Sequence, residues 1–165
     1  MNKVRFLTEQ ALLITLLLII GSIKLPSFFP GAEFQLSAPL AVAIAANFGF
    51  LRYLTAGIGA SILNLLLGTH NFINVLIAMI FRLVAGGLVC LFASRPPFII
   101  LAGPLGSLVA RLALALFIGK AVWALIIAAL PGMIFTALTA YPLTKLLQRI
   151  ISLRDKSSLG GKSNA

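Results

Sequence analysis

The sequence is poor in the side chains from which catalytic and metal sites are built. Its 165 residues include three acidic residues, one histidine and one cysteine. A Ser-His-Asp relay and an HExxH zinc site cannot be assembled, because the histidine is alone and no carboxylate lies deep inside an apolar run. The single cysteine, Cys90, cannot form a disulfide within the chain. We therefore predict that the protein is not an enzyme and holds no metal ion and no cofactor.

Charged residues are scarce, and apolar residues dominate the chain. Only 10% of the residues are charged and 61% are hydrophobic, whereas an ordinary soluble domain is about 25% charged. A helical crossing of the bilayer needs about 20 apolar residues, so this length holds about six crossings and no separate soluble domain. We predict an all-α membrane protein, a six-transmembrane-helix bundle in the lipid bilayer of the cell membrane.

Charges and turn-forming residues divide the chain into six apolar runs, at 6–23, 34–50, 54–67, 72–92, 98–118 and 121–147. Small residues in the third run, among them Gly57 and Gly59, predict close contact with another helix. Pro131 and Gly132 predict a kink in the sixth run. Residues 1–148 form the predicted transmembrane domain, and residues 149–165 a basic cytoplasmic tail that ends in the disordered segment SSLGGKSNA.

The positive charges predict the orientation of the chain. The thirteen Lys and Arg residues are spread between the apolar runs and form no stripe, so we predict no nucleic-acid partner. Six crossings place both termini on one side, and cytoplasmic loops carry the excess of Lys and Arg. The basic residues on the side of the termini are Lys3, Arg5, Arg52, Arg95, Lys145, Arg149, Arg154, Lys156 and Lys162. The opposite side carries Lys24 and Lys120, so both termini are predicted to be cytoplasmic.

Two arginines, Arg82 and Arg111, fall inside apolar runs. At about 1.5 Å per residue each lies about 13 to 15 Å below the outer surface, where a charge costs at least about 2.5 to 3.5 kcal/mol. Among the acidic residues only Glu33, through a folded-in loop, can reach this depth, which leaves at least one arginine unmatched. Because arginine binds carboxylates and phosphates at two points, a small anionic or zwitterionic solute entering from outside is a candidate partner. Snorkelling, bonds to helix carbonyls or docking against a neighbouring subunit are the alternatives.

Four polar residues gather near the predicted outer mouth of these runs: Asn64, His70, Asn71 and Asn74. Together they offer hydrogen-bond donors and acceptors for a small polar molecule. His70 and Asn71 are equally suited to forming a turn and capping a helix. Asn64 and Asn74 are equally suited to hydrogen bonds between helices.

Glu33 and Gln35 stand at the start of the second run, after a loop rich in proline and glycine. They can close over a pocket as a lid, or they can belong to a solvated loop.

Several segments share the form of one transporter family. They are the loop LPSFFPGAEF, the alanine-rich PLAVAIAANFGF, and then AGIGASILNLLLGT and RLVAGGLV. With the short first run, this pattern resembles the substrate-binding S components of energy-coupling factor (ECF) transporters, which are small six-helix membrane proteins with cytoplasmic termini. The resemblance covers roughly Glu9 to Leu143.

The resemblance implies a vitamin, a vitamin precursor or a related micronutrient as the solute, bound from outside. It implies a transmembrane T component and two ATPase subunits as the partners that supply energy. Ala11 and Thr15 would contact the T component, because they stand where the family often has an AxxxA pattern, here with threonine in place of the second alanine. The segment from Lys24 to Gln35 would be a gate, and Arg82, Arg111, Asn64 and residues 70–74 would form the pocket.

Two other functions fit the same sequence. One is a non-transporting membrane scaffold that resembles the cell-shape protein MreD, in which the arginines bind partner helices. The other is an autonomous channel or carrier, which would move solute without further subunits.

Overall fold

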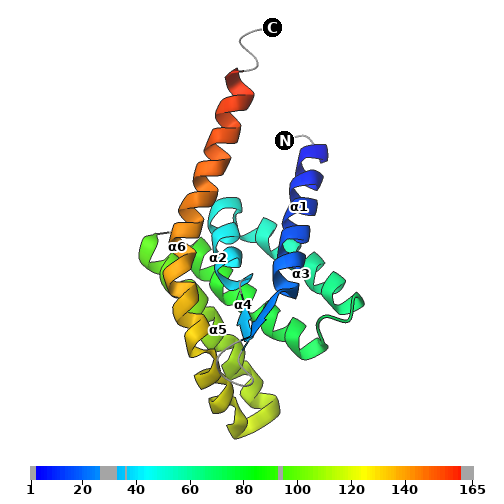
Figure 1. Ribbon diagram of the computed structural model, residues 1–165, viewed down its shortest axis with the longest axis vertical. Helices are drawn as coiled ribbons and strands as arrows, with labels where there is room; N and C mark the ends of the chain where they lie inside the picture. The colour runs from blue at the N-terminus through cyan, green and yellow to red at the C-terminus, as the bar shows by residue number, and fades with distance from the viewer. Residues whose placement is uncertain (1–2, 27–32, 36, 93–94, 161–165) are drawn as a thin grey trace.

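The structure, a computed structural model, is built almost entirely of helices (Figure 1). It describes residues 3–26, 33–35, 37–92 and 95–160, with the side chains of these residues except at 24–26, 33–35, 118 and 155–160. The helices are α1 (Lys3–Ser22), α2 (Ser37–Phe48), α3 (Phe50–Leu66), α4 (Phe72–Leu91), α5 (Pro96–Ile118), the short η1 (Gly119–Ala121) and α6 (Val122–Gly160). Two short strands, β1 (Lys24–Pro26) and β2 (Glu33–Gln35), pair antiparallel with Leu25 opposite Phe34.

Four of the helices, α1, α4, α5 and α6, are long and apolar enough to cross a membrane. The chain is therefore a multi-pass membrane protein by the length and composition of its helices. The two shorter apolar helices are α2, with 12 residues, and α3, with 17 residues. At about 1.5 Å per residue, α2 is only about 18 Å long, less than the apolar core of a bilayer.

The second helix is shorter than the run predicted at 34–50. Its start is delayed because Glu33–Gln35 pair with β1, and its end is set by Gly49, which has a φ of 85°. Glycine tolerates this left-handed conformation, so the chain turns there and begins α3 one residue later.

The short α2 lies in the centre of the molecule. Every residue from Ala38 to Ala45 is buried, and the helix contacts α1, α3, α4, α5 and α6. A helix that is apolar on all sides is typical of such an enclosed position. The alanines allow the close approach of its neighbours.

The last helix is longer than predicted. It runs for 39 residues to Gly160, through Pro131 and Pro142, and in Figure 1 its C-terminal part projects beyond the rest of the molecule. Residues 157–160, which lie in the segment predicted to be disordered, are the last residues of this helix. Between Pro142 and Gly160 the chain contains neither proline nor glycine, so nothing stops the helix earlier.

The core contains buried residues of all the helices from α1 to α6. Its largest fully buried side chains include Tyr53, Ile44, Val42 and Val89. Many large apolar side chains on the outward faces are exposed, among them Leu12 on α1, Leu116 on α5 and Leu138 on α6. An apolar exterior of this kind is suited to contact with lipid chains.

The predicted small-residue face of α3 is confirmed as a site of close helix contact. A methyl group added at Gly59 would lie 2.9 Å from the Cδ1 atom of Ile14 on α1. A methyl group added at Gly57 would overlap the side chain of Arg82 on α4. The glycines thus let α3 pack closely on both neighbours.

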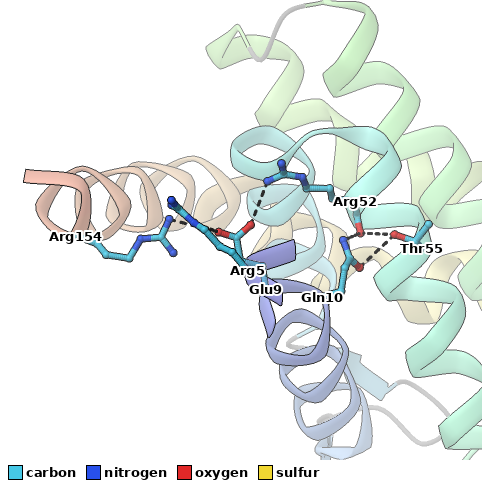
Figure 2. A network of polar contacts seen from close by, with 6 residues as sticks. All are labelled: Arg5, Glu9, Gln10, Arg52, Thr55 and Arg154. Atoms are coloured by element: carbon cyan, nitrogen blue, oxygen red, sulfur yellow. Dashed lines mark hydrogen bonds and ion pairs between the residues drawn. The ribbon is translucent and has the colours of Figure 1, made fainter. Parts of the chain in front are cut away.

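Both ends of the described chain lie at the same end of the molecule (Figure 1). An ion-pair cluster joins them, in which Glu9 of α1 meets Arg5 at 3.4 Å, Arg52 of α3 at 3.3 Å and Arg154 of α6 at 3.6 Å (Figure 2). We call these four residues the Glu9 cluster. It agrees with the prediction that the two termini share one side.

Candidate functional site

A cavity of about 80 Å³ lies between α1, α2, α3, α4 and α5. A site needs about 10 to 15 Å³ of this kind of volume to hold one water molecule, so the cavity has room for a small organic molecule. It is lined by Leu17, Gly21, Ile23, Ser37, Ala38, Ala41, Tyr53, Asn64, His70, Asn74, Ile77, Ala78, Phe81, Arg82, Ser107, Ala110 and Arg111.

Five residues predicted from the sequence meet at this cavity: Arg82, Arg111, Asn64, His70 and Asn74. They come from α3, α4, α5 and the turn before α4. The helical packing thus gathers polar residues that are up to 47 positions apart, from Asn64 to Arg111.

Arg82 reaches from α4 toward α3. Its Nη1 atom donates a hydrogen bond of 2.7 Å to the hydroxyl oxygen of Ser61. The space for this guanidinium exists because Gly57 has no side chain. Arginine carries five N–H donors, so one hydroxyl leaves most of its hydrogen-bonding capacity open to a further partner.

Tyr53 shares this part of the cavity. Its side chain is 0% exposed, and its hydroxyl interacts electrostatically with the guanidinium of Arg82. The hydroxyl nevertheless makes no hydrogen bond of normal geometry to any residue that the structure describes. A buried polar group without a hydrogen bond costs about 1 to 3 kcal/mol, so it is a donor that a bound molecule would satisfy.

Arg111 has weaker protein contacts than Arg82. Its Nη1 atom donates to the backbone oxygen of Ser107, one turn earlier in α5, at 3.4 Å. This contact is one of the alternatives foreseen for the arginines, a bond to a helix carbonyl. Arg111 also borders a smaller cavity of about 20 Å³, whose far side is formed by Met133 and Thr136 of α6.

Neither cavity arginine pairs with a carboxylate among the described side chains. Glu9 is engaged in the cluster at the end of the molecule that holds the termini. The side chains of Glu33 and Asp155 lie outside the described ones. No group of three or more His, Cys, Asp or Glu in the described part of the chain could hold a metal ion.

For Asn64 the sequence left two roles open, a contact with a bound molecule and a hydrogen bond between helices, and its position is consistent with both. Its side chain is almost fully buried, and its Oδ1 atom accepts hydrogen bonds from Ser22 at 3.2 Å and from Thr69 at 2.8 Å. The first bond joins α3 to α1, as expected of an amide between helices. The residue also lines the cavity, so the bond to Ser22 holds α1 and α3 together at the cavity wall.

Asn71 stands outside the cavity. It is exposed and forms the N-cap of α4, where its Oδ1 atom accepts a hydrogen bond of 2.8 Å from the backbone nitrogen of Asn74. The sequence left open whether Asn71 contacts a bound molecule or caps a helix, and the structure shows it as a helix cap. His70 and Asn74 are half-buried and line the cavity.

The remaining predicted residues, in the possible lid and at the possible partner contact, lie on β2 and α1. The backbones of Glu33 and Gln35 form β2, which contacts α6, while their side chains lie outside the described ones. Their role as a lid stays a prediction. Ala11 and Thr15 are both exposed on α1, one turn apart, and the Thr15 hydroxyl donates to the Ala11 carbonyl at 2.8 Å. Their contact with a partner also stays a prediction.

The sequence analysis missed Tyr53, Ser61 and Ser107. Tyr53 follows Arg52 directly, and in an apolar sequence such a pair is also typical of the end of a span. Serines are common at helix contacts in membranes, so neither serine was distinctive without its neighbours.

Comparison with known proteins places the chain among its relatives. No family model matches it, and no solved structure matches it. The chain is 49% identical to Protein BioX of Lysinibacillus sphaericus over 144 residues, which is 87% of this chain and 87% of that protein. The chain therefore belongs to the BioX family.

Proposed function

We propose that this protein is the membrane-embedded, solute-binding subunit of an ECF-type micronutrient transporter. It binds a small anionic or zwitterionic vitamin, precursor or related metabolite from the extracellular side. The observation that carries the proposal is the cavity in which Arg82, Arg111 and the unsatisfied Tyr53 hydroxyl meet with no described carboxylate between them. Buried ionisable groups of this kind are retained in membranes mainly for function.

The proposed topology has six crossings, with both termini on the cytoplasmic side of the plasma membrane. The excess of Lys and Arg on the side of the termini supports this orientation. Although α2 is too short to cross a bilayer alone, its burial among five other helices means that protein, not lipid, surrounds it. The cavity then faces outside through the turn at 67–71.

The proposed mechanism is binding without catalysis. The cavity is surrounded by five helices, and the lower local dielectric inside the protein strengthens the attraction between a guanidinium and an anion. Energy for transport comes from a transmembrane T component and two ATPase subunits, which would dock on the exposed face of α1 at Ala11 and Thr15.

Binding to the purified chain tests this proposal. Native mass spectrometry would detect a small molecule retained from the host cell, and titration of that molecule into wild type, Arg82→Ala and Arg111→Ala would locate its site. The matched control is Arg95→Ala, because Arg95 is exposed at the start of α5 and lies outside the cavity. Unchanged affinity in both cavity variants would contradict the proposed pocket.

Copurification tests the partners. ATPase subunits bound to the protein would support the transporter. Cell-wall assembly proteins would instead support a scaffold that resembles MreD, and solute flux in liposomes with this chain alone would support an autonomous carrier.

A further inference from the structure

The charges that line the cavity are all of one sign. Arg82 and Arg111 contribute two guanidinium groups, and no aspartate or glutamate is among the lining residues that the structure describes. A buried charge without a counter-charge costs several kcal/mol. A ligand with one negative charge would leave the second arginine unanswered, and the ammonium of a zwitterion would meet no carboxylate in this lining.

The two guanidinium groups belong to different walls. Arg82 donates a hydrogen bond to Ser61 on α3. Arg111 donates to the carbonyl of Ser107 on its own helix, α5, and also borders the smaller cavity next to α6. Two separately anchored cations are suited to two separate anionic groups. A single compact anion would be better matched by two arginines that share one anchoring site.

Part of the cavity wall is apolar. It includes Leu17 of α1, Ala38 and Ala41 of α2, Phe81 of α4 and Ala110 of α5. These side chains favour methylene groups, because burial of apolar surface against them is favourable.

We propose that the ligand is a linear aliphatic dicarboxylate, with one carboxylate at Arg82 and the other at Arg111. This inference rests on the proposed function as a solute-binding subunit and names its substrate class. At the Arg82 end the carboxylate also accepts a hydrogen bond from the Tyr53 hydroxyl, which has no hydrogen-bond acceptor among the described residues. The methylene chain lies against the apolar wall.

The first test uses wild-type protein in nanodiscs, so it does not depend on the folding of a variant. Binding of the linear dicarboxylates from succinate to azelate is measured by calorimetry, beside the monomethyl ester of each. Because a hydrogen bond to a charged group contributes about 1.5 to 3 kcal/mol, the diacid should bind at least about tenfold more tightly than its monoester. Equal affinity for the two would overturn the proposal.

The second test assigns the two ends. Arg82→Gln and Arg111→Gln should each reduce the preference for diacid over monoester to less than about twofold, whereas Arg95→Gln should retain it. Tyr53→Phe should weaken diacid binding by at least about tenfold, as expected for one lost hydrogen bond to a charged group. A preference retained in both arginine variants would overturn the proposal.

Other ligands separate this inference from the proposed function. Inorganic phosphate and a zwitterionic amino acid are titrated in parallel. If either binds more tightly than every dicarboxylate and loses affinity in Arg82→Gln, the dicarboxylate is wrong and the solute-binding function stands. If no small anion binds and native mass spectrometry finds none retained, both fail.

Discussion

The arginines at the end that holds the termini are paired with a carboxylate, whereas those in the cavity are not paired with any described carboxylate. At the end that holds the termini, Arg5, Arg52 and Arg154 converge from three helices on Glu9, whose side chain is only 11% exposed (Figure 2). In the cavity, Arg82 and Arg111 meet only a hydroxyl, a backbone carbonyl and the unsatisfied Tyr53 among the described residues.

The difference shows how the chain uses its few carboxylates. The Glu9 cluster joins α1, α3 and α6, and further bonds from Gln10 to the Arg52 carbonyl and from Thr55 to Gln10 strengthen the same contact (Figure 2). That region is complete without any added molecule. The cavity has cations, space and an unused donor, and under the proposed function an anion supplies the missing counter-charge.

Replacing a cavity arginine should have the largest effect on binding. Truncating one partner of a buried, hydrogen-bonded charge pair costs about 2 to 5 kcal/mol, so Arg82→Met should weaken anion binding at least about 30-fold. The ligand-free variant should unfold at no lower temperature than wild type, because an uncompensated buried charge has been removed. Calorimetry and thermal unfolding check the two halves. A variant that unfolds well below wild type would assign Arg82 a structural role like that of Glu9.

Gly57→Ala should have the next largest effect. The added methyl group would overlap the Arg82 side chain and displace the guanidinium from Ser61. Overpacking of this kind costs about 1 to 3 kcal/mol, and the lower end of this range corresponds to about fivefold weaker binding. Gly87→Ala is the matched control, because a methyl group there meets nothing within 4 Å. Equal affinities of these two variants would show that the position of Arg82 does not govern binding.

Glu9→Gln should lower stability and leave anion affinity unchanged. It removes three ion pairs whose arginine side chains are 33% to 58% exposed. Pairs this exposed contribute up to about 1 kcal/mol each, so the expected loss is about 1 to 2 kcal/mol. Thermal unfolding would show the loss, and the difference from wild type should shrink at about 1 M salt, where the Debye length is about 3 Å. A loss of anion affinity would mean that the two ends are coupled.

Asn71→Ala should have the smallest effect. Loss of the cap on α4 costs about 1 kcal/mol of stability, with anion affinity retained because Asn71 lies outside the cavity. Asn71→Ser keeps a capping oxygen and should restore most of the stability. If Asn71→Ala weakened binding at least about tenfold and Asn71→Ser did not rescue it, the residue would be a ligand contact.

Much of the site could be predicted because charged and amide side chains are conspicuous in an apolar sequence. Arg82 and Arg111 were expected at similar depths, and the structure brings both to one cavity with Asn64, His70 and Asn74. Asn71 was ambiguous because a turn residue and a ligand residue have the same chemistry. Only the backbone geometry before α4 identifies it as a cap.

The residues that shape the site were not predictable in the same way. Gly57 makes room for Arg82, and Tyr53 and Ser61 face it, but these roles depend on how α3 packs against α4. The same holds for the short α2, whose end depends on the positive φ of Gly49. Hydropathy identifies apolar runs, and it does not show where inside a run the backbone turns.

The most direct test of the central claim is native mass spectrometry of the protein purified from growing cells, beside the Arg82→Gln/Arg111→Gln double variant. We expect a small anionic molecule bound to the wild-type chain and absent from the variant. A retained molecule that is equally abundant in both proteins, or no retained or added anion that binds the wild type, would contradict the claim that the two arginines await a counter-charge from outside.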